Sequence, residues 1–343
     1  MPRFEADIRL DLSGDQPECS FSAAANEFRL RVYRELKLRT FSSAWIRLQL
    51  DQPKAKIVLA RFRQLYTDRQ AVLGYCLLKE TLLPEERAQA PWFLIGTKHE
   101  IDSFSLWDDY PRCNYGTLPA SRNILNDCFV SERFVDAYRE ATLTGLEFLR
   151  CRNKGRKSGR PWFAARATAH LGNGLDHPWF LRERWEAMMR HDPRSYRDQR
   201  LESGQWSFHQ ALLKPNLSLP EPVAQLLSLV DGEPTSVIRG VKFLMVPRFL
   251  EAHLPSVDFA YLCETPDGPN ADGKMMRFRR LAVRAPAARR LIERGILIEK
   301  ELFPVRAVSG RDAGHVERPD EPACPMWTDG EWRALKEQEG ALR

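Results

Sequence analysis

The chain has 343 residues, which is enough for two hydrophobic cores, because a single core stops growing at roughly 250 to 300 residues. A hydrophobic content of 43%, with nine Trp and eighteen Phe, excludes a largely disordered protein. The net charge of +6 and the pI near 9.0 permit an anionic partner, but this excess is small for a nucleic-acid-binding protein.

The start of the chain has no apolar segment of the kind that directs export. No window approaches the roughly 18 uninterrupted apolar residues of a membrane span. We therefore expect a cytoplasmic protein with no membrane contact. The seven cysteines are dispersed and include no CxxC pair, so we expect free thiols. Neither a metal nor a cofactor is predicted, because no set of clustered ligands is present.

The first hundred residues predict both strands and helices. Residues 4–12 alternate apolar and polar residues and predict a strand, whereas residues 23–50 include an apolar face at helical spacing. Residues 55–66 and 71–83 are rich in apolar residues, and their pattern fits a helix or a strand. Residues 90–95 predict a buried strand with a proline at its edge.

The tripeptide Pro-Trp-Phe occurs three times, at Pro91, Pro161 and Pro178. Three such aromatic pairs would suit a ligand that stacks on rings. Trp and Phe after a proline are more often the start of a buried strand, so we interpret these aromatic residues as part of the core.

Residues 123–152 predict a β-α-β unit. A short apolar run ends at Val130, and the Ser131 side chain can cap the helix that follows. Gly145 stands where we expect the helix to end, and an apolar pair after Glu147 predicts the second strand. The buried face of the helix is formed by apolar residues at helical spacing, Phe134, Tyr138 and Ala141.

Residues 276–306 repeat this order. An apolar run ends at Val283, Pro286 suits the first turn of a helix, Gly295 closes the helix, and an apolar pair follows Glu301. The match predicts an internal duplication, and two unrelated β-α-β pieces are the alternative. We therefore predict an α+β fold with two related halves, each containing a β-α-β unit, and with mixed sheets.

Residues 150–160 read RCRNKGRKSGR, with six basic residues and no acidic one, which predicts an exposed loop or a linker. The segment that follows is polar and helix-like. These features predict an N-terminal α+β domain over 1–160, a polar helical connection over 161–204 and a C-terminal α+β domain over 205–343. Within the last domain, residues 328–338 predict a short capped helix.

No motif in the chain predicts catalysis. The phosphate-binding patterns GxxxxGK[ST] and GxGxxG are absent, as are HExxH and GxSxG. Adjacent acids such as Asp108 and Asp109 point apart and do not form an acid/base pair. No nucleophile or orienting carboxylate stands at a recognisable spacing from the histidines, so we interpret these three as structural or surface residues: His177, His191 and His209. We predict a protein that is not an enzyme and has no catalytic residue.

Basic residues gather in two places, residues 150–160 and 277–294. Arg277 and Arg279 alternate with apolar residues, which on a strand places cations on one face. Such a face is either a solubilising surface or the complement of an acidic protein. We predict eight partner-binding residues: Arg150, Arg152, Lys154, Arg156, Arg277, Arg279, Arg280 and Arg284. A nucleic-acid-binding protein that uses the same two stretches, and an uncharacterised hydrolase with a dispersed site, are the alternatives.

Residues 128–134 (CFVSERF) and 144–148 (TGLEF) resemble a stretch of the bacterial immunity proteins of polymorphic-toxin and type VI secretion systems, and residues 281–305 contain a degenerate echo. The double-CXXCG proteins are also similar, although single cysteines, Cys113 and Cys263, stand where that family has pairs. The resemblance implies a cytoplasmic, non-enzymatic protein that protects its producer by binding a cognate toxin. Because the chain is basic, the toxin is expected not to be a strongly basic nuclease, unless the contact surface is locally acidic.

Overall fold

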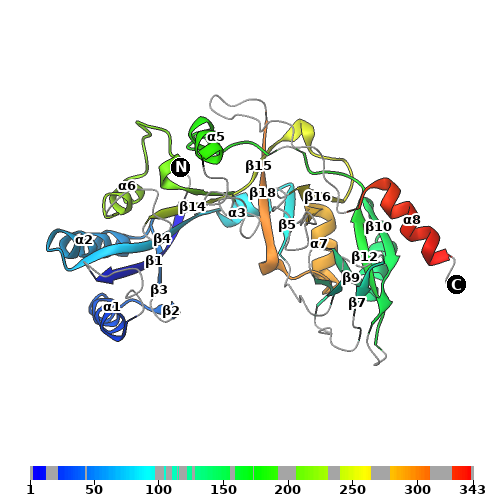
Figure 1. Cartoon of the computed structure of the whole chain (residues 1–343), viewed down its shortest axis with the longest axis horizontal. Helices are drawn as coiled ribbons and strands as arrows, with labels where there is room; N and C mark the ends of the chain where they lie inside the picture. Colours follow the sequence, from blue (N-terminus) through cyan, green and yellow to red (C-terminus); the bar gives the residue numbers. More distant parts are fainter. Residues whose placement is uncertain are drawn as a thin grey trace. The chain divides into compact units, whose positions relative to one another are not determined.

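The computed structural model has an α+β fold with several mixed sheets, so the predicted fold class is confirmed (Figure 1). None of the described helices is long and apolar enough to cross a membrane. The structure describes residues 3–12, 22–42, 45–96, 104–105, 110–113, 115, 122–125, 128–154, 159–172, 174–191, 206–230, 240–263, 279–309 and 327–340.

The chain divides into two compact units, and each unit is assembled from two separate segments. Unit 1 consists of Met1–Arg87 and His177–Val246. Unit 2 consists of Ala88–Asp176 and Pro247–Arg343. The chain thus forms two compact units, but the described residues form three hydrophobic clusters, two of them in unit 2, and neither unit is a continuous stretch of the sequence.

This division corrects the predicted boundaries of 1–160, 161–204 and 205–343. Those boundaries keep neighbouring segments together, whereas the strands of this chain pair with strands that are distant in sequence. The predicted connection contains β12 (Trp162–Ala167) and α5 (Arg182–His191). The first of these belongs to unit 2 and the second to unit 1, so the connection is not a separate part of the molecule.

Unit 1 begins with six elements in the order β-α-β-β-α-β: β1 (Arg3–Leu12), α1 (Ala23–Glu35), β2 (Thr40–Ser42), β3 (Trp45–Gln49), α2 (Pro53–Thr67) and β4 (Ala71–Thr81). The strands lie in the order β4-β1-β3-β2, and β1 is antiparallel to both β3 and β4. Two β-α-β units therefore interlock, because each holds one strand of the other between its own two strands. This is the split β-α-β arrangement of ferredoxin-like sheets.

The second segment of unit 1 widens this sheet. β14 (Val241–Met245) pairs in parallel with β4, and β13 (Trp206–His209) pairs antiparallel with β14. The segment also supplies α6 (Glu221–Leu227), and α3 (Pro84–Ala88) follows β4. Pairing between β4 and β14 joins the two segments of unit 1 in one sheet, although residues 88–176 separate these segments in the sequence.

Burial patterns resolve the two segments whose pattern fitted either a helix or a strand. Residues 55–66 fall within α2, where Pro53 occupies the first turn at no loss of a helical hydrogen bond, and its buried residues recur at helical spacing: Ala55, Val58, Leu59, Phe62 and Leu65. Residues 71–83 cover β4, where burial alternates from Cys76 onward, as expected for a strand with one face on the core.

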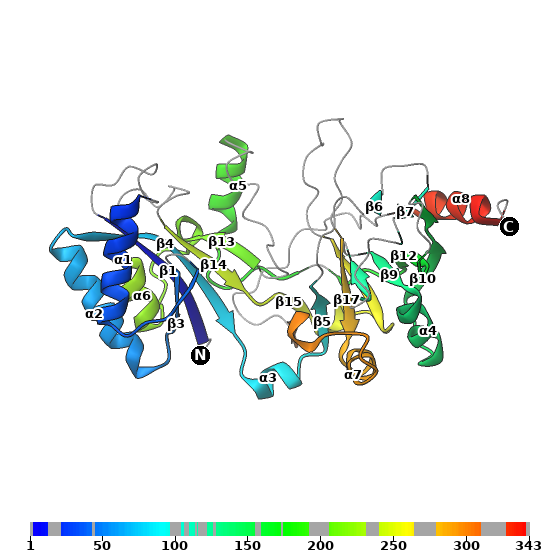
Figure 2. The ribbon, with the colours of Figure 1, turned by 90° about the horizontal axis from the view of Figure 1, so that it is seen from below.

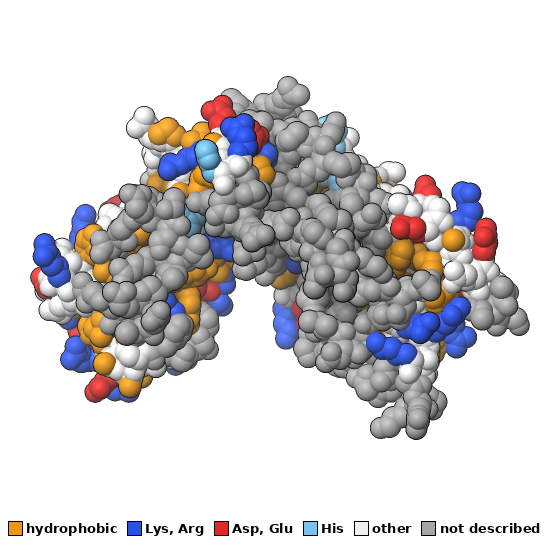
Figure 3. Space-filling view, viewed as in Figure 1, with side chains coloured by type: hydrophobic (Ala, Val, Ile, Leu, Met, Phe, Trp, Pro, Cys, Tyr) orange, Lys and Arg blue, Asp and Glu red, His pale blue; other side chains and the backbone are white. Residues whose placement is uncertain are grey.

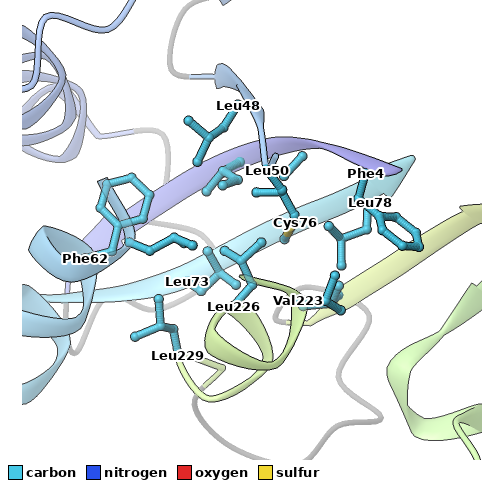
Figure 4. Packing of buried hydrophobic residues seen from close by; sticks show 14 of the residues in the cluster. Phe4, Leu48, Leu50, Phe62, Leu73, Cys76, Leu78, Val223, Leu226 and Leu229 are labelled. Carbon is cyan, nitrogen blue, oxygen red and sulfur yellow. The ribbon is translucent and has the colours of Figure 1, made fainter. Parts of the chain in front are cut away.

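The core of unit 1 lies between the sheet and the helices. In Figures 1 and 2, α1, α2 and α6 lie together on one face of the sheet. Figure 4 shows Val223 and Leu226 from α6 beside Cys76 and Leu78 of β4, and Phe62 from α2 farther along the same cluster. All five side chains are at most 2% exposed, so their burial supplies much of the stability of unit 1.

Unit 1 also buries charged side chains, and it pairs them. Arg29 on α1 is fully buried, and its Nη1 donates to Asp11 Oδ1 at 2.8 Å. Asp7 accepts from Arg47 Nε at 2.8 Å and from Lys79 Nζ at 2.6 Å. Burial alone would raise the pKa of Asp7, but the hydrogen bonds from Arg47 and Lys79 outweigh it and lower the pKa. The carboxylates of Asp7 and Asp11 on β1 therefore form ion pairs within unit 1.

The first predicted β-α-β unit forms in unit 2 from β9 (Phe129–Ser131), α4 (Glu132–Glu140) and β10 (Leu146–Arg150). β8 (Ile124–Leu125) precedes it and pairs antiparallel with β9. The sheet order is β10-β12-β9-β8, so β12 lies between the two strands of the unit and is antiparallel to both.

The second predicted unit forms from β17 (Arg279–Arg284), α7 (Ala285–Glu293) and β18 (Leu302–Val308), after β16 (Phe259–Cys263). Here β5 (Trp92–Ile95) lies between β17 and β18 and is antiparallel to both. The sheet order is β15-β18-β5-β17-β16, with β15 (Arg248–Leu250) at one edge. Both copies thus have the same topology, but both belong to unit 2. The prediction of one copy in each half is corrected.

The inserted strands match residue by residue. In the first copy Trp162 pairs with Ser131, the N-cap of α4, and in the second Trp92 pairs with Arg284, the N-cap of α7. Both tryptophans are buried, which confirms that these Pro-Trp-Phe segments start core strands. β5 precedes the first copy and β12 precedes the second. Each copy therefore contributes its leading strand to the sheet of the other.

The third Pro-Trp-Phe segment is also part of a core. Trp179 lies in unit 1, where it is 9% exposed and stacks on Phe4 with the ring centroids 5.3 Å apart. Phe180 is buried beside it and contacts Phe208 at 5.6 Å between centroids. The interpretation of these aromatic residues as core residues is therefore confirmed at all three places.

Two polar residues link each copy to the turn after the other copy's helix. Asn123, just before β8, donates from Nδ2 to Ile296 O at 3.0 Å. Asp258, just before β16, accepts at Oδ2 from Thr144 N at 2.9 Å. The two residues are equivalent, because the amide of Ser131 donates to Asn123 O and the amide of Arg284 donates to Asp258 O. The copies are joined by reciprocal contacts as well as by exchanged strands.

The expected role of Gly145 is corrected. α4 ends at Glu140, and the left-handed position after it is taken by Thr142, with φ of 50°. In α7 this position is Gly295, with φ of 64°, as predicted. Gly145 has φ of 99° and precedes β10, where an added Cβ would lie 2.2 Å from Phe259 O. It is required for the close approach of two backbones.

The two helices α4 and α7 share one core, and α8 (Asp329–Gly340) covers another. Phe134 and Tyr138 of α4 pack in the same cluster as Ala287 and Leu291 of α7. On the other core, buried α8 residues lie with Leu149 of β10. The predicted capped helix over 328–338 is confirmed, because Thr328 and Glu331 bond each other's backbone amides. A small sheet contains β6 (Phe104–Ser105), β7 (Arg112–Cys113) and β11 (Arg152–Asn153).

Candidate protein-binding surface

α4 presents a charged stripe because its opposite face is buried. The Ser131 hydroxyl accepts from Phe134 N at 3.2 Å, which caps the helix as predicted. The Tyr138 hydroxyl accepts from Leu146 N at 3.0 Å and so ties the helix to the start of β10. Burial raises the pKa of Tyr138. With these residues turned inward, the outward positions at i, i+4 and i+8 are all acidic: Glu132, Asp136 and Glu140.

α7 presents arginines on the equivalent surface. Pro286 lies in its first turn, and Ala287, Ala288 and Leu291 are buried. The exposed residues beyond the first turn are Arg289, Arg290, Glu293 and Arg294. The side chains of Arg289 and Arg290 make no hydrogen bond or ion pair within the described part of the chain. α7 therefore carries two exposed cations that make no such contact with the residues that the structure describes.

The two copies differ in charge at equivalent positions. Asp136 is the fifth residue after the N-cap Ser131, and Arg289 is the fifth residue after the N-cap Arg284. An acidic side chain in the first copy thus corresponds to a basic one in the second. The shared topology supports two helices whose outer faces have opposite charge at this place.

A pocket of about 390 Å³ lies beside α4 and the end of α7. We call it the charged pocket. Two of its lining residues are buried and apolar, Ala137 and Ile296. The others are three acidic and three basic residues, and no histidine is found among the described residues that line it: Glu132, Asp136, Glu140, Arg133, Arg160 and Arg294. The size is that of a small-ligand site, but the lining is far more charged than such sites usually are.

Only some of the charges in the pocket are satisfied within the molecule. Arg294 Nη1 lies 2.9 Å from Glu140 Oε2, and Arg133 Nη2 donates to Arg294 O at 3.0 Å. Both side chains of the ion pair are exposed, at 41% and 71%, so the pair adds little stability and mainly orients Arg294. Asp136 and Arg160 have no side-chain partner among the residues that the structure describes.

The strand exchange explains why Arg160 reaches this pocket. Trp162 pairs with Ser131, and the amide of Glu132 donates to Pro161 O at 3.2 Å. The residue just before Pro161 therefore lies at the N-terminus of α4. The acidic spacing of α4 is visible in the sequence, but the proximity of Arg160 depends on a strand pairing that no local pattern predicts.

The predicted basic residues near 150–154 lie at the end of β10 and in β11. Figure 3 shows Lys and Arg side chains gathered over this end of the sheet in unit 2. Arg150 is exposed and hydrogen-bonds the Tyr115 side chain. Arg152 is half-buried, and its guanidinium lies 4.3 Å from the centre of the Tyr110 ring. Lys154 is exposed with no described side-chain partner, so it is the freest of the three.

The predicted partner-binding residues of the second copy also differ in exposure. Arg284 is exposed and donates from Nη1 to Ser256 O at 3.3 Å, whereas Arg280 is half-buried on β17. Arg279 lies on β17, but its side chain lies outside the described residues, as do Arg156 and Arg277 entirely. No described contact joins this group to the residues near 150–154. The eight predicted partner-binding residues include neither Asp136 nor Arg160 of the pocket, although Arg160 belongs to the predicted basic stretch 150–160.

Histidines and cysteines in the described part serve the fold. His177 is buried and accepts from Trp179 N at 3.2 Å, and His209 accepts from Ala211 N at 3.3 Å. Burial lowers the pKa of His209 to about 4. The described cysteines are free and buried: Cys76, Cys113, Cys128 and Cys151. Within the described ranges, no three His, Cys, Asp or Glu residues are placed to hold a metal ion.

Comparison of the chain with protein-family models, with curated proteins and with solved structures finds no match. The resemblance of residues 128–148 to immunity proteins stays a prediction from the sequence.

Proposed function

We propose that this protein is a non-enzymatic immunity protein, which binds a cognate bacterial toxin in the cytoplasm and neutralises it. The observation that supports the proposal most is the outer face of α7. Arg289 and Arg290 are exposed there and have no partner within the described part of the chain. Charges left unpaired on a rigid surface speed the encounter with a protein of opposite charge and fix its orientation.

The architecture of unit 2 suits this role. Exchanged strands and reciprocal contacts hold α4 and α7 on one shared core. A surface that is already ordered loses little conformational entropy when a partner binds. Residues 128–148, which carry the resemblance to immunity proteins, form β9, α4 and the start of β10. The sequence resemblance and the charged surface therefore concern the same part of the molecule.

A nucleic-acid-binding role is the second candidate, because Lys154 and Arg150 are exposed in a basic stretch. Acidic residues on α4 oppose it, since a phosphate backbone near the α4 surface would meet Glu132, Asp136 and Glu140. A protein surface of mixed charge fits this arrangement better. Affinity for duplex DNA that falls steeply with added salt would favour the nucleic-acid role; a flat salt response would remove it.

The test of the proposed function is protection. The full chain is co-expressed in a bacterium with each secreted toxin whose gene lies beside its own. We expect growth to be rescued for one toxin, and we expect that toxin to co-purify with the chain. If no neighbouring toxin is neutralised and none co-purifies, the proposal is wrong.

A further inference from the structure

The charged pocket of unit 2 has a chemistry that restricts what can enter it. Its lining mixes both signs: three carboxylates, of Glu132, Asp136 and Glu140, and three guanidinium groups, of Arg133, Arg160 and Arg294. An apolar group would leave these charges without water and without partners, which is costly. An occupant with one charge sign would be repelled by half of the lining. The pocket therefore requires an occupant that carries both signs.

Three charges in the pocket are available to such an occupant. Glu132, Asp136 and Arg160 have no side-chain hydrogen bond or ion pair within the described residues. Glu140 and Arg294 already pair with each other at 2.9 Å, so they form the fixed edge of the site. These groups can bind one cation between the two carboxylates, Glu132 and Asp136, and one anion beside the guanidinium of Arg160.

The flank of the pocket adds a second requirement. Arg290 precedes Arg294 by one helical turn, so the row of arginines continues from the pocket along α7. Arg289 lies next to it and is also unpaired within the described part of the chain. A partner seated in the pocket would therefore also contact two exposed cations. Its surface around the inserted group must be acidic.

We infer that the charged pocket receives a Lys or Arg side chain from a projecting loop of the partner protein, with acidic residues of that loop facing Arg160 and α7. This inference rests on the proposed function and names the surface through which it acts. It also reconciles a basic immunity protein with its own locally acidic stripe. The stripe recognises one cation, while the surrounding arginines recognise an acidic surface.

The test uses a charge swap in the full chain. The variant Asp136→Arg with Arg160→Asp keeps the net charge of the protein. It replaces one available carboxylate of the pocket with a cation and the available guanidinium with a carboxylate. Its matched control is Arg63→Asp with Asp68→Arg at the end of α2 in unit 1, where both side chains are exposed and unpaired within the described residues. Circular dichroism and thermal unfolding check that both variants fold as the wild type does.

Two measurements compare ligand binding by the wild type, the pocket variant and the control. In the first, a phage-displayed library of short random peptides is selected on each protein. We expect the wild type and the control to enrich peptides that have Lys or Arg flanked by Asp or Glu, and the pocket variant to lose them. Absence of this pattern on the wild type, or equal enrichment on the pocket variant, would overturn the inference without bearing on the proposed function.

In the second measurement, the toxin that the chain protects against is titrated onto each protein. We expect the pocket variant to bind about ten to a hundred times more weakly and the control to bind normally. If the toxin is neutralised and binds the pocket variant as tightly as the wild type, the proposed function stands and the pocket inference fails. Loss of affinity for duplex DNA in the pocket variant, with toxin binding unchanged, would also refute it.

Discussion

Two groups of charged residues, one on β1 and α1 of unit 1 and one on α4 and α7 of unit 2, differ in burial and in pairing. In unit 1, Asp11 and Arg29 are buried and paired, and Asp7 is held by two cations. In unit 2, Asp136 and Arg289 stand on the outer faces of helices and have no partner among the described residues. These charges of unit 1 are part of its core, whereas Asp136 and Arg289 have no partner among the described residues of unit 2.

This difference shows how net charge can mislead. The chain carries +6 in total, and that sum alone indicates an anionic partner. Once paired charges are set aside, the available ones in unit 2 include both acids and bases within one pocket. The arrangement of unpaired charges, not their sum, indicates which partner fits.

The largest expected effect concerns the exchanged strands of unit 2. Trp92 and Trp162 are 1% and 5% exposed at equivalent positions. We expect Trp92→Ala and Trp162→Ala each to lower the free energy of unfolding by about 3 to 5 kcal/mol. Because each strand lies in the sheet of the other copy, both variants should weaken all of unit 2 and spare unit 1. Hydrogen exchange resolved by peptide measures this. Destabilisation confined to one copy would refute the exchange.

The buried ion pair of unit 1 provides the next test. Asp11→Ala leaves the Arg29 guanidinium buried without its carboxylate, and breaking such a pair costs about 3 kcal/mol or more. We expect the low end, because Arg29 keeps hydrogen bonds to Leu10 O and Asn26 Oδ1. Urea denaturation measures the loss. The apolar double variant Asp11→Leu with Arg29→Met should recover only part of it, because Arg9 Nη2, which lies 3.2 Å from Asp11 Oδ2, still loses that carboxylate. No loss for the single variant would contradict the account.

Acid should weaken unit 1 through His209. Its pKa is lowered by burial to about 4, below the ordinary 6.5, so the unfolded chain binds the proton more readily. Stability from this group is complete above pH 6.5 and is lost as the pH falls toward 4, by about 2 to 3 kcal/mol. His209→Asn keeps an acceptor for Ala211 N and should flatten the dependence. Equal acid sensitivity in both proteins would exclude His209 as the cause.

The smallest effect on stability is expected at the outer face of α7. Arg289→Glu with Arg290→Glu removes no described contact, so the free energy of unfolding should change by less than about 0.5 kcal/mol. The same variant should reduce the affinity for the toxin, because two cations of the proposed contact become anions. A stability loss above about 1 kcal/mol would mean that these arginines serve the fold after all.

Local signals predicted the repeated units well. Ser131, Pro286 and Gly295 act within one turn of their own helices, so the sequence alone was enough to locate α4 and α7. Gly145 was misplaced because its conformation is required by a distant backbone, that of Phe259. Thr142 took the left-handed position instead, which no residue preference predicts for a β-branched side chain.

Long-range pairing accounts for what the sequence did not predict. The boundary near residue 160 failed because β12, which we assigned to the connection, pairs with β10 and β9 and so belongs to the sheet of the first copy. The pairing of β12 with β9 also places Arg160 beside α4, so the sequence did not predict the charged pocket either. Arg279 lies on β17, but residues 277 and 278 lie outside the described residues, so the alternation stays a prediction. The sequence did not predict that Arg152 and Arg280 are half-buried, because a strand pattern does not say how much of each face is covered.

Footprinting of the complex tests the central claim most directly. The full chain is exposed to hydroxyl radicals with and without the toxin it neutralises, and side-chain oxidation is located by mass spectrometry. We predict that the toxin protects Arg133, Arg160 and the outer residues of α7, while α2 in unit 1 is labelled equally in both states. Protection confined to unit 1, with the charged pocket still labelled in the complex, would contradict the account.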